Sequence, residues 1–192
     1  MAAGAVAALP GTGRRRELQQ ALVETDGNVS IIVATVALLH AEDRSSAELA
    51  GLLGVLPPID WPPEYNGPET RQWMRGLLEA HPEEPGFGTW YIIGNGRLAG
   101  TAGYKGPPDE KGEVEIGYSV VEADRMKGYA SGAVRLLVQR AFRDPRVTAV
   151  LAETLPLLVG SQAVLTKCGF TQVRRRTDPE DGEILCYAIR RP

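Results

Sequence analysis

The sequence has few of the residues that build metal sites and disulfide frameworks. Its 192 residues include 2 cysteines and 2 histidines, and Cys168 and Cys186 do not form a CxxC pair. Two isolated thiols make neither a tetrahedral zinc site nor a set of structural disulfides. We therefore expect no metal. The low cysteine count indicates a reducing compartment, which we take to be the cytoplasm.

Long apolar runs and a strong excess of one charge are also absent. The apolar stretch from Ser30 to Leu39 is too short to span a bilayer. The apolar start from Met1 to Pro10 comes before its arginines, which is the reverse of a secretory signal. The net charge is −3, and the basic residues gather only in the triplets 14–16 and 174–176. Nucleic-acid binding needs a broader basic face, so we expect neither a membrane nor a nucleic-acid partner.

What the chain does have is the composition of a globular domain, with 43% hydrophobic and 23% charged residues. A chain of this length buries a full core without disulfides or metals. We interpret residues 1–28 as an N-terminal extension and residues 29–192 as one domain. Within the extension, residues 15–25 predict a helix that Asp26, Gly27 and Asn28 would end.

The first part of the domain predicts a strand and two helices. The apolar run from Ile31 to Leu39 indicates a buried strand that continues into a helix. Residues 47–53 have helical spacing, with Ser45 or Ser46 as the N-cap.

A proline-rich loop and another helix follow. The segment 57–68 holds five prolines and must be loop. Residues 70–80 then predict an amphipathic helix whose inner face carries Trp73, Leu77 and Leu78.

The rest of the chain alternates between strand and helix signals. The predicted strands are 89–93, 97–104, 113–121, 147–154 and 183–189, and the predicted helices are 128–142 and 161–167. An Asn95-Gly96 pair between the first two strands is typical of a hairpin. This order predicts an α/β (α+β) protein with a mixed sheet.

The junction between the strand 113–121 and the helix 128–142 carries the residues that bear on chemistry. It reads Arg125, Met126, Lys127, Gly128, Tyr129, Ala130 and Ser131. Small residues at positions 128 and 130 let the backbone approach a ligand closely, and a helix start offers free N–H groups. With the two cations, this arrangement predicts a diphosphate site. The alternative is a strand-to-helix turn in which the small residues serve packing alone.

This junction also carries a family resemblance. Arg125-x-x-Gly128-x-Ala130 resembles the [QR]xxGx[GA] coenzyme A signature of the GNAT acetyltransferase superfamily. Three further segments resemble its RimJ/RimL-type branch in the same chain order: 115–118, 152–156 and 161–170. The resemblance covers residues 30 to 190. It implies a central mixed, mostly antiparallel sheet that is flanked by helices and splays open, and an N-acetyltransferase activity.

The resemblance implies acetyl-coenzyme A as the co-substrate and places it along the junction. The backbone amides from Met126 to Ser131 would hold its diphosphate. Val120 and Val121 would pair with the pantetheine arm like an added strand, and their amides would polarise the thioester carbonyl. Lys167 would approach the adenosine phosphate end.

An alkylamine acceptor is protonated at neutral pH, so the reaction needs a base. Glu115 is our first candidate, because it lies on the strand face opposite Ile116 and Tyr118. The alternative is a solvated strand residue. Ser161 matches the family's serine in the cofactor-facing helix, which would protonate the leaving thiolate. The alternative for Ser161 is a serine at a helix terminus without a catalytic role.

Three residues are candidates for acceptor binding. Glu153 is the second choice as base, and its alternative role is a structural partner for an arginine. Trp61 and Tyr65 lie in the proline-rich segment that walls the acceptor site in related proteins. Their alternative role is a turn anchored by one buried tryptophan. The acceptor itself could be a protein N-terminus, an amino acid or a small amine, because specificity lies in loops.

Departures from the family pattern leave other functions open. Leu158 stands where the family commonly has asparagine, Gly132 where it often has glutamate, and Leu165 where many members have a tyrosine acid. These changes would also suit a non-catalytic acyl-coenzyme A-binding module. An interaction protein that uses the apolar N-terminal extension is a further alternative. The branch suggests a homodimer, which the sequence does not establish.

Overall fold

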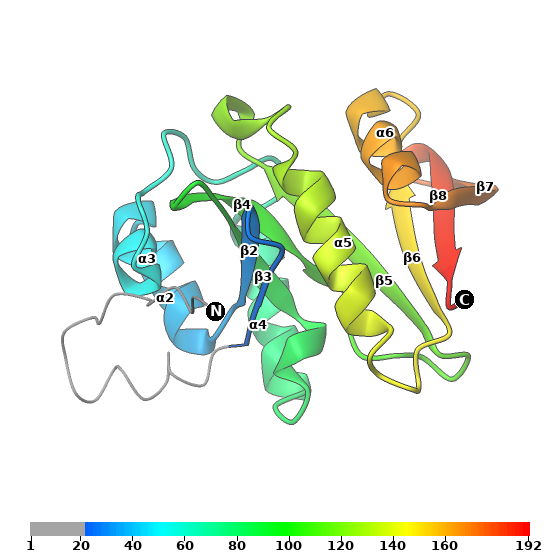
Figure 1. Cartoon of the computed structure of the whole chain (residues 1–192), viewed down its shortest axis with the longest axis horizontal. Helices are drawn as coiled ribbons and strands as arrows, with labels where there is room; N and C mark the ends of the chain where they lie inside the picture. The colour runs from blue at the N-terminus through cyan, green and yellow to red at the C-terminus, as the bar shows by residue number, and fades with distance from the viewer. Residues whose placement is uncertain (1–21) are drawn as a thin grey trace, which may run out of the picture.

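A computed structural model describes residues 22–192. These residues form one eight-stranded sheet with the order β1-β2-β3-β4-β5-β6-β8-β7 (Figure 1). The strands are β1 Val23–Thr25, β2 Val29–Val33, β3 Thr89–Gly94, β4 Arg97–Tyr104, β5 Glu113–Val120, β6 Ala149–Thr154, β7 Thr171–Asp178 and β8 Gly182–Arg190. Every neighbouring pair is antiparallel except β5 and β6. The predicted mixed, mostly antiparallel sheet is therefore confirmed.

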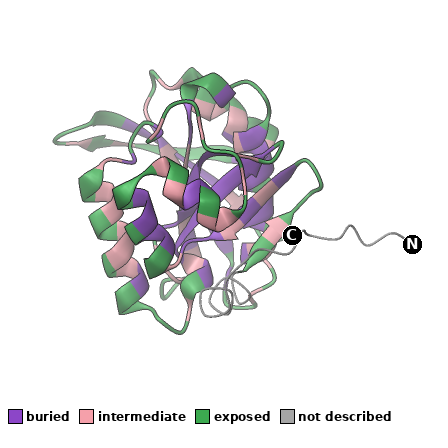
Figure 2. Ribbon diagram, turned by 90° about the vertical axis from the view of Figure 1, so that its left-hand side faces the viewer, coloured by how far each residue is buried: buried purple, intermediate pink, exposed green. Residues whose placement is uncertain are grey.

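Helices cover both faces of the sheet. The helices are α2 Val36–Arg44, α3 Ser46–Leu53, α4 Pro68–Ala80, α5 Tyr129–Ala141 and α6 Val159–Lys167, with 3-10 turns η1 Pro85–Phe87 and η2 Glu122–Asp124. Strand β3 shows the two layers, because Trp90 and Ile92 pack into the core under α5, whereas Tyr91 and Ile93 pack with α2 and α3. Figure 2 looks onto the second layer, with exposed helix surfaces in front of buried strands.

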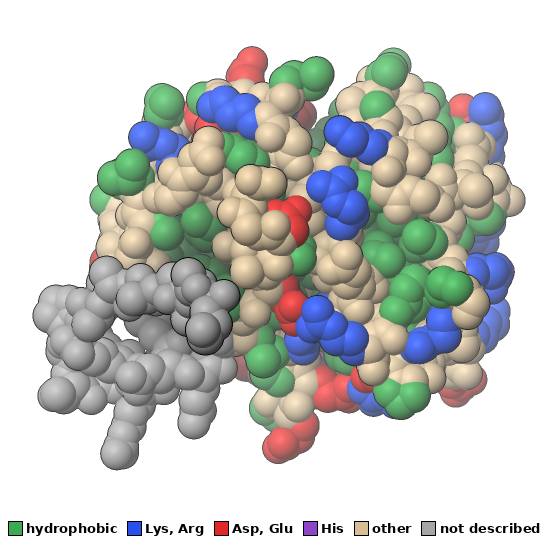
Figure 3. All heavy atoms as spheres, viewed as in Figure 1, with side chains coloured by type: hydrophobic (Ala, Val, Ile, Leu, Met, Phe, Trp, Pro, Cys, Tyr) green, Lys and Arg blue, Asp and Glu red, His purple; other side chains and the backbone are tan. Residues whose placement is uncertain are grey.

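Helix α5 follows the sequence closely. Its predicted apolar stripe is buried, and Arg135 and Gln139 lie on the exposed side. On the face that carries α5 and α6, Lys and Arg side chains are interspersed with acidic and uncharged ones (Figure 3). No helix among residues 22–192 is long and apolar enough to cross a bilayer.

The helix predicted for residues 15–25 is wrong at its C-terminal end. Val23–Thr25 is a strand that pairs antiparallel with β2, and the residues before Leu22 lie outside the described part of the chain. The turn at residues 26–28 therefore joins two strands, in which Asp26 Oδ1 accepts hydrogen bonds from the amides of Asn28 and Val29. The sheet thus starts before residue 29, where we had placed the domain boundary.

The strand and helix predictions for residues 31–53 are confirmed. The apolar run forms β2 and then α2, and the Thr35 side chain accepts from the Leu38 amide at the helix start. Ser45 is the N-cap of α3, since its Oγ accepts from the Glu48 amide.

One detail of α4 is wrong. Leu78 is buried as predicted, but Trp73 is 47% exposed. Both residues are apolar, and the helical pattern alone gave them the same face. Only the side of α4 that carries Leu78 faces the sheet, so Trp73 stays at the surface.

The Asn95-Gly96 hairpin is confirmed, with positive φ at both turn residues. Strand β7 was missed. Its residues are mostly exposed on both faces, so they show no alternation of apolar and polar positions. It pairs with β8 at the edge of the sheet.

Candidate active site

Among residues 22–192, the sheet opens at its one parallel pair of strands. Strands β5 and β6 are in register from Glu113 opposite Ala149 to Ile116 opposite Ala152, and the pairing then stops. Both strands continue beyond that point, β5 to Val120 and β6 to Thr154. A gap therefore separates their C-terminal ends, between α5 and α6 (Figure 1). We call this feature the β5–β6 gap.

The β5 edge presents backbone groups to this gap. The Val121 amide donates to Ala99 O at 2.9 Å, so Ala99 and Val121 are a hydrogen-bonded pair of the β4–β5 ladder. Antiparallel pairs alternate, and the next pair, Gly100 and Val120, therefore turns its N–H and C=O groups outward. The Val120 amide faces the gap. The prediction for Val121 is corrected, because its amide is already used within the sheet.

The start of α5 lies beside the gap and carries unpaired amides. The backbone N–H groups of residues 126–131 donate no hydrogen bond to any group within residues 22–192. Gly128 is the N-cap with φ +83°, and Met126 also has positive φ. A Cβ atom at position 128 would meet nothing within 4 Å. The junction is thus an open stretch of hydrogen-bond donors at a helix N-terminus, which suits a diphosphate.

The two cations of the junction are engaged by neighbouring groups. Arg125 donates from Nε to Val120 O at 3.3 Å and from Nη2 to Glu64 Oε2 at 2.9 Å. Its guanidinium thereby joins the end of β5 to the proline-rich loop. Lys127 Nζ pairs with Asp124 Oδ1 at 2.6 Å. Both remain close to the predicted diphosphate position, but neither charge is free in this structure.

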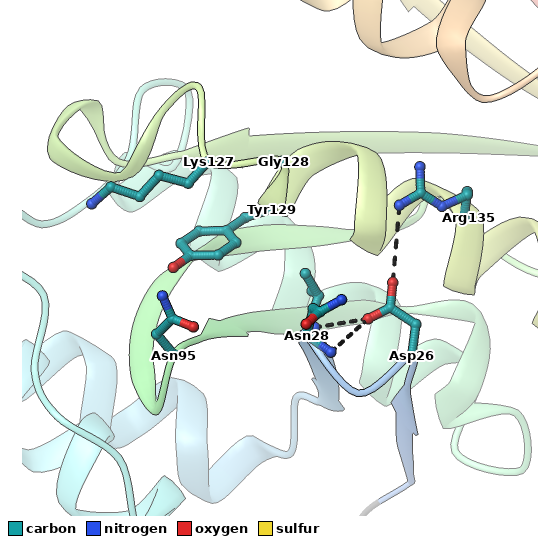
Figure 4. Close-up of a pocket in the computed structure, with 8 residues that line it drawn as sticks. Asp26, Asn28, Asn95, Lys127, Gly128, Tyr129 and Arg135 are labelled. Atoms are coloured by element: carbon teal, nitrogen blue, oxygen red, sulfur yellow. Dashed lines mark hydrogen bonds and ion pairs between the residues drawn. The ribbon is translucent and has the colours of Figure 1, made fainter.

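A polar hollow of about 320 Å³ lies on the other side of the α5 start (Figure 4). Its lining includes Asn28 and Asn95 from two turns, Lys127 from the junction before α5, and Arg135 from α5. The Tyr129 ring packs so closely on Gly94 that a Cβ there would lie 2.4 Å from the ring. Tyr129 therefore offers its amide to a ligand, whereas its side chain belongs to the core.

Helix α6 borders the gap on the side of β6. Cys168 Sγ lies 3.5 Å from Ser131 O, which brings the end of α6 against the first turn of α5. Lys167 is exposed next to this contact, and no ion pair involves it among the described residues. Its predicted position near the phosphate end is consistent with this arrangement. Leu158 precedes α6 without a side-chain cap, as expected for an apolar residue there.

Ser161 meets a residue that the sequence did not single out as functional. Its Oγ lies 3.0 Å from Tyr118 Oη, and the Tyr118 hydroxyl also lies 3.1 Å from the Ser161 carbonyl oxygen. Tyr118 comes from β5, so this contact crosses the β5–β6 gap. Burial raises the pKa of Tyr118 to about 12, and the hydrogen bond from Ser161 opposes that rise.

Glu115 points to the opposite face of β5 from Tyr118, as its place in the alternation requires. Its carboxylate pairs with Lys105, and its side chain is 28% exposed. Gly117 follows on the same face, and a Cβ there would meet nothing within 4 Å. Glu115 thus borders open space in front of β5, where an acceptor can approach.

Glu153 is held in a structural ion pair. Its two oxygens accept from Arg176 at 3.0 and 2.7 Å, and Cys186 Sγ lies 3.3 Å away. The Arg176 hydrogen bonds hold the pKa of this carboxyl below its usual value. A base with a lowered pKa and an arginine on both oxygens is a poor proton acceptor, so the geometry favours the structural role for Glu153.

The two aromatic residues of the proline-rich loop behave differently. Trp61 is partly buried and donates from Nε1 to Glu42 Oε1 at 3.1 Å, whereas Tyr65 is 63% exposed with φ +64°. Trp61 anchors the loop, and Tyr65 is presented to solvent. The ion pair of Glu64 with Arg125 places this loop next to the end of β5.

These residues fit acetyl-coenzyme A. Unpaired amides surround the start of α5, and the Val120 amide faces the gap. On the β6 side of the gap, the buried Thr154 hydroxyl has no hydrogen-bond partner among residues 22–192. A ligand with a diphosphate at one end and an amide-containing arm would satisfy these groups.

Comparison with known proteins identifies the family. A family model described as an acetyltransferase (GNAT) domain matches residues 34–171. The uncharacterized N-acetyltransferase YjdG of Bacillus subtilis (strain 168) is 29% identical over 151 residues, which are 78% of this chain and 89% of YjdG. An FsC-acetyl coenzyme A-N(2)-transacetylase of Aspergillus fumigatus is 29% identical over 130 residues, 60% of this chain and 55% of that protein.

Solved structures share the fold. The ribosomal L7/L12 alpha-N-protein acetyltransferase RimL, solved with coenzyme A, has a TM-score of 0.67 and 18% identity, covering 88% of this chain and 98% of that chain. The microcin C7 self-immunity acetyltransferase MccE, solved with acetyl-CoA and AMP, has a TM-score of 0.62 and 14% identity, covering 86% and 93%. The chain therefore belongs to the GNAT acetyltransferase family and is an N-acyltransferase that uses acetyl-coenzyme A.

Proposed function

We propose that the β5–β6 gap binds acetyl-coenzyme A and that the chain acetylates a primary amine that approaches from the Glu115 face of the sheet. The observation that carries this proposal is the set of unpaired amides at residues 126–131 beside the gap. The bound co-substrate supplies an acetyl thioester. Calorimetry with acetyl-coenzyme A, against dephospho-coenzyme A and ATP, tests the binding site. No binding at millimolar acetyl-coenzyme A would contradict it.

We assign different steps of the reaction to residues on the two faces of β5. Glu115 Oε takes the proton that the amine must lose, directly or through a water, and the ion pair with Lys105 holds the carboxylate in place. The outward Val120 amide donates to the carbonyl oxygen of the thioester as negative charge builds there. Ser161 Oγ lies on the other face and donates a hydrogen bond to the sulfur, which leaves as a thiolate.

We expect Glu115→Gln to lower kcat about 100-fold, the size typical for loss of a general base. Affinity for acetyl-coenzyme A should be unchanged, because Glu115 is on the face of β5 opposite α5 and α6. Steady-state kinetics with the best amine of a panel measures the first quantity, and calorimetry measures the second. The matched control is Glu113→Gln, at the far end of the same strand face. Full activity of Glu115→Gln would remove Glu115 as the base.

Gly117 tests where the acceptor binds. Its Cβ position is open and its φ is not in the left-handed region, so Gly117→Leu should fold normally. The added side chain would occupy the space beside Glu115. We expect the KM for the amine to rise about 10-fold or more, the cost of about 1.4 kcal/mol in binding, with acetyl-coenzyme A affinity retained. An unchanged KM would show that the acceptor approaches elsewhere.

The acceptor class is proposed at the level of a protein N-terminus, an amino acid or a small amine. RimL is by its title a protein alpha-N-acetyltransferase, and the neighbour AAC(6')-Ib is by its title an aminoglycoside acetyltransferase. A panel of peptides, amino acids, polyamines and aminoglycosides should therefore be screened. Both cysteines are unpaired thiols, which supports the cytoplasm as the proposed location.

A further inference from the structure

The Tyr118–Ser161 contact is a direct polar link between a strand residue of β5 and α6, across the β5–β6 gap. The two residues are 43 positions apart in the chain. Tyr118 lies on the face of β5 that carries the buried Ile116 and Val120, and it packs against that core. Its hydroxyl therefore reaches Ser161 from a rigid position in the sheet.

The Tyr118 hydroxyl has one proton and two acceptors within reach, Ser161 O and Ser161 Oγ. When Tyr118 donates to Ser161 O, the Ser161 hydroxyl can donate back to Tyr118 Oη. Its proton then points at Tyr118 and is not presented to a ligand in the gap. When Tyr118 donates to Ser161 Oγ instead, the serine proton is free to point into the gap. The same contact thus has a resting and a presenting arrangement.

The surroundings keep the phenol protonated. Burial raises the pKa of Tyr118 to about 12, and Cys168 and Tyr187 are the other titratable groups that act on it. Burial also raises the pKa of the Cys168 thiol. Tyr118 can therefore act as a hydrogen-bond donor at neutral pH.

We propose that Tyr118 is a positioning residue for Ser161, and that it donates to Ser161 Oγ when a thiolate lies in the gap. The Ser161 hydroxyl proton then points at the sulfur of coenzyme A and stabilises its negative charge. This inference rests on the cofactor site proposed above. It assigns to Tyr118, the last residue of the segment 115–118, a role at the leaving group, on the face of β5 opposite Glu115.

The test uses coenzyme A with its free thiol, so it needs no acceptor. The pKa of the bound thiol is followed through the ultraviolet absorbance of the thiolate, with the complex of desulfo-coenzyme A as the baseline for the protein's own groups. Free coenzyme A in the same buffer is the reference, and a hydrogen bond to the charged form of its thiol lowers the pKa of that thiol. We expect the bound thiol to titrate about one unit lower in the unsubstituted protein. Tyr118→Phe and Ser161→Ala should each reverse most of that shift.

The double variant separates positioning from an independent effect. If Tyr118 acts through Ser161, Tyr118→Phe should add nothing in the Ser161→Ala background. Tyr187→Phe is the matched control, because Tyr187 is also buried in this core and makes no hydrogen bond through its hydroxyl within the described chain. Affinity for coenzyme A should stay within a few fold in all of these variants.

The outcomes distinguish this inference from the proposed function. Failure of the unsubstituted protein to bind coenzyme A would overturn both. Binding with a thiol pKa that shifts in Ser161→Ala but not in Tyr118→Phe would overturn the role of Tyr118 alone. Additive shifts in the double variant would do the same. A shift in Tyr118→Phe that is absent in the Ser161→Ala background and absent in Tyr187→Phe would support it.

Discussion

Gly128→Val is expected to reduce the affinity for acetyl-coenzyme A about 1,000-fold. A Cβ at this position meets no protein atom within 4 Å, so the valine side chain would extend into the space in front of the unpaired amides. A diphosphate could then reach fewer of them. Loss of two charge-assisted hydrogen bonds costs about 4 kcal/mol, which corresponds to that factor. Calorimetry measures the affinity directly.

The substitution has a second effect that must be separated. Gly128 has φ +83°, a conformation that costs an L residue about 1–2 kcal/mol. Gly182 is a matched control, because it has φ +75° and an open Cβ position, and it is the first residue of β8, after the turn from β7. Gly182→Val should lose similar stability and keep full affinity. A folded Gly128→Val protein with unchanged affinity would show that the diphosphate is bound elsewhere.

The parts of the fold that the sequence predicted are those that local signals determine. The Asn95-Gly96 turn fixes a hairpin by its own φ requirements, and α5 has one apolar stripe that faces the core. Strand β7 lacks such a signal, since it lies at the sheet edge with both faces mostly exposed. The short β1 is equally exposed, and only its pairing with β2 defines it.

The candidate site shows the same division. The start of α5, with its unpaired amides, is one continuous segment, so the residue types in that segment were enough to predict a diphosphate site. The hydrogen bond from the Val121 amide to Ala99 O depends on the β4–β5 register, which no single segment specifies. The pairing of Tyr118 with Ser161 and of Glu115 with Lys105 likewise depends on where the strands and α6 meet. The sequence named Ser161 and Glu115 as candidates but could not predict the partners that the structure gives them.

Buried Glu42 provides the largest expected effect on stability. It is 5% exposed in α2 and accepts three hydrogen bonds: from Trp61 Nε1 at 3.1 Å, Asn66 Nδ2 at 2.7 Å and Tyr91 Oη at 2.7 Å. Glu42→Ala would remove the acceptor for all three donors. An unsatisfied buried group costs about 1–3 kcal/mol, so we expect a loss of about 4 kcal/mol in the free energy of unfolding. Urea unfolding at neutral pH measures it.

Glu42→Gln is the informative control because its amide can satisfy the same partners. The Gln oxygen can accept from Trp61 and Asn66, and its NH₂ group can donate to the Tyr91 hydroxyl, which accepts as well as donates. We therefore expect a loss below about 1 kcal/mol. Equal losses in the Ala and Gln variants would show that the negative charge, rather than the hydrogen-bond geometry, stabilises this cluster.

The pH dependence follows from the same burial. Desolvation raises the pKa of Glu42 above its usual value, although hydrogen bonds from Tyr91, Asn66 and Trp61 oppose the rise. The native state therefore binds the Glu42 proton more tightly than the unfolded chain does. That contribution to stability is fully present below the unfolded pKa and is lost as the pH rises through the folded pKa. Relative to Glu42→Gln, the unsubstituted protein should gain stability as the pH falls toward about 4.3, the ordinary pKa of a glutamate.

Because Trp61 and Asn66 anchor the loop that presents Tyr65, Glu42→Ala should also raise the KM for the amine more than it changes acetyl-coenzyme A affinity. If the loop anchored by Glu42 borders the acceptor, stability and acceptor binding will fall together in Glu42→Ala and both will be restored in Glu42→Gln.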